Sequence, residues 1–177
     1  MEFRGQRIGI FVDIQNLYYS AKFLYRSYVN FSAILKNGAG DGQLVRVIGY
    51  VIKTDSSSTP LDIYRIDKEQ SFFKALKKHK FEVKLKDLQV FPGGMMKGNW
   101  DVGITVDIIR LAPKLDVVVL ASGDGDFTDL VEYLQNHGIY VVIFAFGKSA
   151  SLDLIKRADK FVDMDKDLKT FLLRKIK

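Results

Sequence analysis

Short, continuously apolar runs recur along this 177-residue chain and alternate with longer amphipathic segments. The clearest runs are IGIFVDI (8–14), QLVRVIGYVIKT (43–54), DVVVLAS (116–122) and IYVVIFAF (139–146). Strands covered by helices on both faces lose the polar alternation of a half-exposed strand, so such runs are typical of parallel sheets. The pattern predicts an α/β protein, a three-layer α/β/α sandwich with a central, mainly parallel, Rossmann-like sheet.

The segments between these runs read as helices. They cover 15–28, 60–79, 100–112, 126–137, 151–158 and 166–177, and two further strands are expected at 81–91 and 160–165. Pro60 suits a first helical turn, Pro113 stops a helix and Gly138 caps one. The stretches NGAGDG (37–42) and PGGMMKGN (92–99) are expected to be a turn and a loop. We therefore predict a single domain over 1–177, with a C-terminal helix over 165–177.

Composition narrows the function classes. The chain has no cysteine, which excludes disulfides, thiolate catalysis and cysteine-ligated zinc. Its formal net charge of +6 favours a polyanion such as nucleic acid as the partner. Positive charge is concentrated in residues 65–86, which contain Arg65, Lys68, Lys74, Lys77, Lys78, Lys80, Lys84 and Lys86. The N-terminal apolar run is too short to span a bilayer, so we expect a soluble, cytoplasmic protein without a membrane partner.

Four aspartates follow the predicted strands. Asp13 ends the first strand, and Asp124 follows the strand at 116–122. Asp126 opens the next helix, and Asp101 opens the helix after the strand at 81–91. Because strand C-termini and the following helix N-termini share one edge of a parallel sheet, these side chains are expected to meet there.

Helical periodicity predicts which acids of the helices at 100–112 and 126–137 point inward and which face solvent. Asp101 falls within an apolar arc that contains Ile104 and Ile108, so it is expected to point inward, whereas Asp107 lies on the opposite, solvated side. Asp126 and Asp129 have the spacing of a capping box, with Asp129 at the edge of its apolar arc. Any one of these residues alone reads as a helix cap. Four at one edge instead favour a hard cation, Mg²⁺ or Mn²⁺.

Three segments resemble a known family. The similarity is to the NYN domain, in its LabA-like branch, within the PIN-like nuclease superfamily. The segments that carry it are IGIFVDIQN, MKGNWDVGITVDII and VVLASGDGDFTDLVEYLQNHGIYVVIFAFGKSASLDLIKRADKFVDM. The resemblance implies a PIN-like α/β/α sandwich with an acidic pocket that binds Mg²⁺ or Mn²⁺ and acts on RNA. It implies catalytic and metal-binding roles for Asp13, Asp101, Asp124 and Asp126.

The same resemblance implies supporting roles around this pocket. They fall on Asn16, Ser122 and Asp107, with Asp129 nearby, and substrate contact is expected from Lys97 and Trp100. Here two residues, Asn99 and Trp100, separate the lysine-glycine pair from Asp101, where many relatives have one. Trp100 is expected either to stack on an unpaired base or to pack in the core.

The leading hypothesis is a metal-dependent endoribonuclease acting on single-stranded RNA. The first alternative is an RNA-binding or regulatory module with the same fold and little turnover. A second is a phosphoacceptor domain of receiver type, for which Lys148 after the strand at 139–146 is the one fitting feature. Tyrosines at 18, 19, 25 and 28 have helical spacing and predict packing in the core or in a homodimer.

Overall fold

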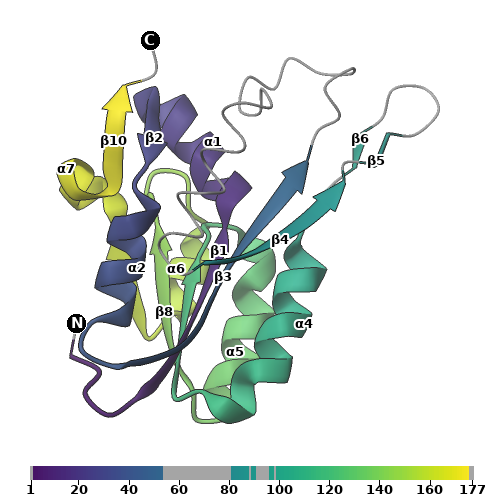
Figure 1. Ribbon diagram of the computed structural model, residues 1–177, viewed down its shortest axis with the longest axis vertical. Coiled ribbons are helices and arrows are strands. Elements are labelled where there is room, and N and C mark those ends of the chain that lie inside the picture. The colour runs from purple at the N-terminus through teal and green to yellow at the C-terminus, as the bar shows by residue number, and fades with distance from the viewer. Residues whose placement is uncertain (1, 54–80, 88, 91–95, 98, 176–177) are drawn as a thin grey trace.

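The computed structural model describes residues 2–53, 81–87, 89–90, 96–97 and 99–175. Six strands form the central sheet, and every neighbouring pair is parallel (Figure 1). Across the sheet they run β4 (Glu82–Asp87), β3 (Gln43–Lys53), β1 (Arg7–Asp13), β7 (Val117–Ala121), β8 (Tyr140–Ala145) and β9 (Lys160–Asp163). The predicted α/β fold with a parallel central sheet is confirmed.

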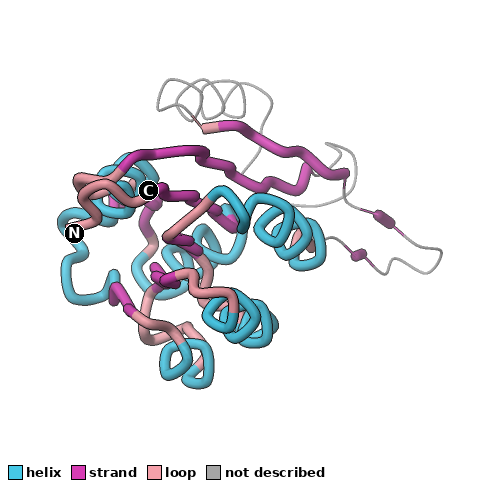
Figure 2. Tube along the Cα trace, turned by 90° about the horizontal axis from the view of Figure 1, so that it is seen from below, coloured by secondary structure: helices cyan, strands magenta, loops and turns pink. Residues whose placement is uncertain are grey.

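Helices cover both faces of this sheet (Figures 1 and 2). The first layer holds α1 (Ile14–Tyr25), α2 (Phe31–Ala39) and α7 (Leu168–Phe171); the second holds α4 (Asp101–Leu111), α5 (Thr128–Asn136) and α6 (Leu152–Arg157). Alternation along β1 supplies both cores, because Ile10 and Val12 face the first layer while Phe11 faces the second. Burial of both strand faces explains the unbroken apolar runs of the sequence.

The strand order places the site. Numbered along the chain, the sheet strands lie in the order 3-2-1-4-5-6, so the order reverses between β1 and β7. Ligands of open α/β sheets bind at such a switch point, beyond the carboxyl ends of the strands. Asp13 ends β1 there, and Ser122 follows β7. A receiver-type domain has the order 2-1-3-4-5, so the phosphoacceptor hypothesis is wrong.

The region between α1 and β3 differs from the expectation. The helix expected over 15–28 ends at Tyr25, because Arg26 adopts a left-handed conformation with φ 48°. The short strand β2 (Ser27–Val29) follows, and α2 then occupies part of the stretch read as a turn. Asn30 caps α2 by accepting a hydrogen bond from the Ala33 amide at 3.3 Å.

The C-terminal segment is the second difference. The helix expected over 165–177 is wrong beyond Phe171: a 3-10 helix, η3 (Met164–Asp167), leads into α7, and β10 (Leu172–Lys175) then pairs antiparallel with β2. Tertiary pairing overrides helix propensity here, because the Asn30 amide also donates to the Phe171 carbonyl at 2.8 Å.

Smaller elements complete the described chain. Two short strands, β5 (Gln89–Val90) and β6 (Met96–Lys97), pair antiparallel beyond the end of β4, where one longer strand and a loop were expected (Figure 2). One 3-10 turn, η1 (Ala112–Lys114), follows α4, and a second, η2 (Gly125–Phe127), precedes α5. The helix expected over 60–79 lies outside the described residues. Among the described helices, none has the length and hydropathy needed to cross a bilayer.

Candidate functional site

Asp13 lies at the switch point of the sheet, where β1 ends and α1 begins. Its carboxylate caps the helix by accepting a hydrogen bond from the Asn16 amide at 3.1 Å. Its other oxygen accepts from the Ser122 hydroxyl at 3.4 Å, and Asp13 as a whole is only 9% exposed. The Asp13 carboxylate, at the end of β1, is therefore hydrogen-bonded both to α1 and to the loop after β7.

Burial raises the pKa of Asp13 to about 6. This value includes the negative charges of Asp101 and Asp124, which also raise the pKa, and the hydrogen bonds from Asn16 and Ser122, which lower it. A carboxylate that is costly to ionise in this surrounding is one that a nearby cation would stabilise.

Three further carboxylates gather next to Asp13. Asp101, Asp124 and Asp126 each offer an oxygen, and these oxygens all lie within 4.8 Å of one another. Burial, followed by repulsion from Asp124 and Asp126, raises the pKa of Asp101. The donor set is all carboxylate, which suits Mg²⁺ or Mn²⁺ and not a soft metal. We call Asp101, Asp124 and Asp126 the acidic cluster.

Local backbone structure fixes the loop that carries two of these acids. Asp124 caps η2 by accepting a hydrogen bond from the Asp126 amide at 3.1 Å. The Asp124 amide donates to the buried Ser122 hydroxyl at 3.3 Å. The Gly123 amide donates to the side-chain oxygen of Asn16 at 2.9 Å. Asn16 and Ser122 thus connect Asp13 to the loop that carries Asp124, and their supporting roles stay a prediction.

Gly123 has a role that the sequence reasoning did not assign. A Cβ atom there would lie 3.0 Å from the Cα of Ala150, and the Gly123 carbonyl accepts from the Ser151 amide at 2.9 Å. The loop after β8 therefore packs directly on the loop that carries Asp124. The sequence feature that indicates this contact is the glycine between Ser122 and Asp124, because two backbones can approach this closely only at a residue without a side chain.

Asp107 was expected on the solvated side of its helix, and that expectation is wrong. Its side chain is only 15% exposed. It accepts a hydrogen bond from the Tyr50 hydroxyl at 2.9 Å and pairs with the Lys84 ammonium at 2.7 Å. Asp107 on α4 therefore contacts Tyr50 of β3 and Lys84 of β4, and joins the helix to the sheet.

Trp100 is packed against the protein. Its indole N–H donates to the Val51 carbonyl at 2.9 Å, and its ring centre lies 5.3 Å from that of Tyr50. The Lys86 ammonium lies 5.7 Å from the ring centre, and a Cβ atom at Gly103 would clash with the indole at 2.5 Å. These contacts match the packing alternative for Trp100.

The other predicted residues lie as follows. Asp129 is exposed in the first turn of α5 and is not among the carboxylates of the acidic cluster. Lys97 belongs to β6, but its side chain lies outside the described part of the chain. Of the lysine-rich segment 65–86, residues 65–80 are likewise not described. Lys84 pairs with Asp107, and Lys86 donates to the Asn99 carbonyl at 3.1 Å.

The same arrangement of sequence segments occurs in known proteins. The NYN domain model matches residues 7–165, which include Asp13 and the acidic cluster. The chain belongs to the NYN domain family. It is 25% identical over 183 residues to the Low amplitude and bright protein LabA of Synechococcus elongatus, an alignment covering 97% of this chain and 90% of LabA. The predicted NYN and LabA-like resemblance is confirmed.

A solved structure supports the fold of this NYN protein. It is a Vibrio parahaemolyticus protein of unknown function, 36% identical in sequence, with a TM-score of 0.81. The superposition covers 98% of this chain and 99% of the other. The likeness therefore includes the sheet and the helices that carry the acidic cluster.

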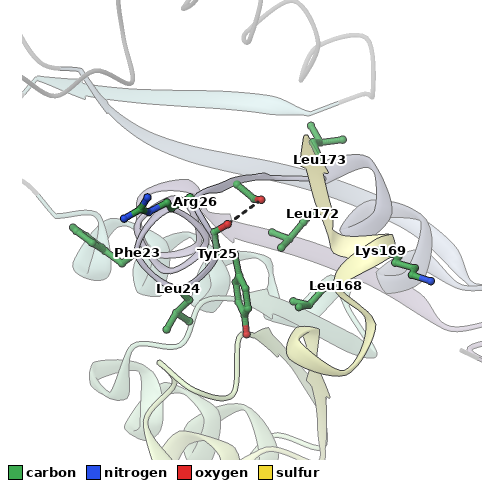
Figure 3. A pocket seen from close by; sticks show the side chains of 9 residues that line it. Phe23, Leu24, Tyr25, Arg26, Leu168, Lys169, Leu172 and Leu173 are labelled. Atoms are coloured by element: carbon green, nitrogen blue, oxygen red, sulfur yellow. Dashed lines mark hydrogen bonds between the residues drawn. The ribbon is translucent and has the colours of Figure 1, made fainter. Parts of the chain in front are cut away.

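A separate apolar hollow of about 780 Å³ lies between the end of α1 and the segment α7–β10 (Figure 3). Tyr25, Leu168 and Leu172 face one another across it, and no carboxylate of the acidic cluster lines it. The Tyr25 hydroxyl donates to Asp165 at 2.5 Å. The hollow is thus distinct from the candidate metal site.

Proposed function

We propose that this protein is a divalent-metal-dependent endoribonuclease that hydrolyses phosphodiester bonds of RNA. The observation that carries the proposal is the acidic cluster beside the buried Asp13, at the switch point of the sheet. Membership of the NYN family, whose proteins are generally nucleases, supports the same reaction class. The net charge of +6 favours a polyanionic substrate.

The carboxylates fit a hard cation, so we assign Asp101, Asp124 and Asp126 as its ligands, with Asp13 completing the site. A bound Mg²⁺ or Mn²⁺ ion supplies charge stabilisation to a phosphate and lowers the pKa of water. Without a cation, these carboxylates would repel both one another and an incoming phosphodiester. The acids therefore need the ion before RNA can approach.

The remaining residues act by holding these acids in place. Asn16 and Ser122 donate to Asp13 and also bind the backbone of the Gly123–Asp124 turn. Asp13 on β1 and Asp124 after β7 are therefore held in fixed positions relative to each other. Such preorganisation lets the ligands be ready without reorganisation when substrate arrives.

The test is cleavage of end-labelled single-stranded RNA with Mg²⁺, with Mn²⁺ and with EDTA. The compared proteins are wild type, Asp124→Asn and Asp129→Asn. Asp129 is a matched control, because it lies on the same loop-helix segment, is exposed and is not part of the acidic cluster. We expect metal-dependent cleavage by wild type and Asp129→Asn, with loss in Asp124→Asn.

Other outcomes assign the protein differently. RNA binding without cleavage under any metal condition would support a binding or regulatory module instead. Equal cleavage by all three proteins would place the activity outside the acidic cluster. The homodimer remains a prediction, and sedimentation velocity of the purified chain tests it.

A further inference from the structure

The less buried face of α1 forms a continuous stripe that starts at the candidate site. Asn16, Tyr19, Ser20 and Phe23 follow the i, i+3, i+4, i+7 spacing of one helical face. The opposite face, with Ile14, Leu17, Tyr18 and Ala21, is buried in the core. We call Asn16, Tyr19, Ser20 and Phe23 the α1 stripe.

Two aromatic side chains dominate this stripe. The rings of Tyr19 and Phe23 stack with their centres 6.0 Å apart and their planes 19° apart. Phe23 is 78% exposed, and Figure 3 shows it projecting from α1 on the side away from Leu172. The Tyr18 ring meets Tyr19 edge-on at 5.6 Å, which holds Tyr19 in place from the core side. Phe23 therefore presents its ring outward on a rigid helix, and the partly buried Tyr19 ring lies beside it.

The stripe is joined to the candidate site through its first residue. The Asn16 side-chain oxygen accepts from the Gly123 amide, next to Asp124. With a rise of 1.5 Å per residue, Tyr19 lies about 4.5 Å and Phe23 about 10 Å further along the helix axis. Ser20 accepts a hydrogen bond from the Ser149 hydroxyl at 2.9 Å, so the loop after β8 borders the stripe. A strand bound at the acidic cluster would meet both rings within a few nucleotides.

Positive charges flank the same helix face. Lys22 lies three residues after Tyr19 on α1, and its ammonium lies 5.6 Å from the Tyr18 ring centre. Arg26 is exposed, and no carboxylate in the described ranges pairs with it. Aromatic faces beside cations are the combination that binds single-stranded nucleic acid, because bases stack and phosphates are neutralised.

We propose that the α1 stripe binds the single-stranded segment of RNA next to the phosphodiester held at the acidic cluster. Tyr19 and Phe23 stack on unpaired bases, and Lys22 and Arg26 face the backbone. This deepens and rests on the proposed ribonuclease function. The stripe takes the role first expected of Trp100, whose ring is packed against Tyr50 and Gly103.

The test measures RNA affinity with Ca²⁺ in place of Mg²⁺, a hard cation that carboxylates also bind, so that the negative charge of the acidic cluster is neutralised. A gel of the same samples checks that the RNA stays uncut. Fluorescence anisotropy compares wild type, Tyr19→Leu, Phe23→Leu and the control Tyr133→Leu, another exposed aromatic, on α5. The probes are a labelled single-stranded RNA and an RNA duplex of equal length. Loss of one stacked base weakens single-strand binding by about fivefold or more. We expect that loss in both stripe variants, no change in the control and no change for the duplex.

A modified RNA separates stacking from a general effect on the fold. Replacing one nucleotide by an abasic unit should weaken wild-type binding at the position that meets Phe23. The same abasic RNA should then bind Phe23→Leu no more weakly than intact RNA does. Thermal melting confirms that each variant folds, which the exposure of Phe23 favours.

The outcomes distinguish this proposal from the proposed function. A wild type that cleaves RNA while both stripe variants keep full affinity overturns the stripe assignment alone. A wild type that binds single strands through Phe23 but cuts none keeps the stripe and removes the nuclease. Equal losses on single strand and duplex also overturn base stacking. A dimer lost in Phe23→Leu, with RNA affinity unchanged, assigns the stripe to a second copy of the chain and overturns the proposal.

Discussion

Replacing Asp13 by asparagine should stabilise the metal-free protein at neutral pH. Asp13 is almost fully buried, and burial raises its pKa to about 6 from 3.8. Asparagine keeps the shape and accepts the hydrogen bond from the Asn16 amide. Its own amide donates to the Ser122 oxygen once that hydroxyl rotates. The substitution therefore removes the charge with little loss of hydrogen bonding.

The size of the effect follows from proton linkage. A pKa raised from 3.8 to about 6 costs the folded state about 3 kcal/mol once the Asp13 carboxyl is ionised. Because the folded pKa is the higher one, the contribution of Asp13 to stability is fully present below about pH 4 and is lost as the pH rises through about 6. Asparagine does not ionise, so the variant escapes this loss. We expect up to about 3 kcal/mol of added stability at pH 7.5, or several degrees in melting temperature.

Urea unfolding in EDTA at pH 4, 5, 6 and 7.5 measures this difference. The two proteins should be nearly alike at pH 4, should diverge between about pH 4 and pH 6, and should keep a constant difference above that. Asp129→Asn controls for removal of one negative charge. A variant less stable than wild type at pH 7.5 would refute the reasoning. A gain of equal size at pH 4 and pH 7.5 would do the same, since ionisation would not be its cause.

Three further predictions concern metal binding and the residues around the site. Mn²⁺ should raise the melting temperature of wild type progressively with concentration and should do so much less in Asp124→Asn, read by differential scanning fluorimetry. Asp107→Ala should cost about 1–3 kcal/mol in urea unfolding, because Tyr50 and Lys84 lose their partner, while RNA cleavage per folded molecule stays within about twofold. Gly123→Ala should reduce cleavage at least tenfold, because the new Cβ atom pushes against the Ala150 backbone. Tenfold corresponds to about 1.4 kcal/mol in transition-state free energy. Unchanged cleavage kinetics would show that the loop tolerates the shift.

The strands of the central sheet were predictable because burial on both faces leaves a direct mark on the sequence. Val117–Ala121 is apolar at every position, and every residue of it is buried. The segment Phe31–Ala39 carries no such mark, since it contains Asn37 and Gly38, which are poor helix formers. Its helix depends on the Asn30 cap and on Phe31 and Ile34 packing into the core.

The residues around Asp107 and the C-terminus show where periodicity stops being informative. A helical wheel identifies the polar side of α4 but not whether that side faces water or Lys84 of a neighbouring strand. Helix propensity favours a helix after Phe171, but pairing of Leu172 with Val29 makes a strand. Both outcomes depend on partners that are distant in sequence.

The sequence alone determined the α/β architecture and the placement of Asp13, Asp101, Asp124 and Asp126 at strand ends and helix starts. Only the tertiary structure decided which three carboxylates come within 4.8 Å and which one is buried beside them. It also decided that Trp100 packs on Tyr50 and donates to the Val51 carbonyl, whereas Phe23 stays exposed on α1. The physical reason is that local patterns specify elements and their faces, whereas distances between side chains depend on strand order and on how the elements pack.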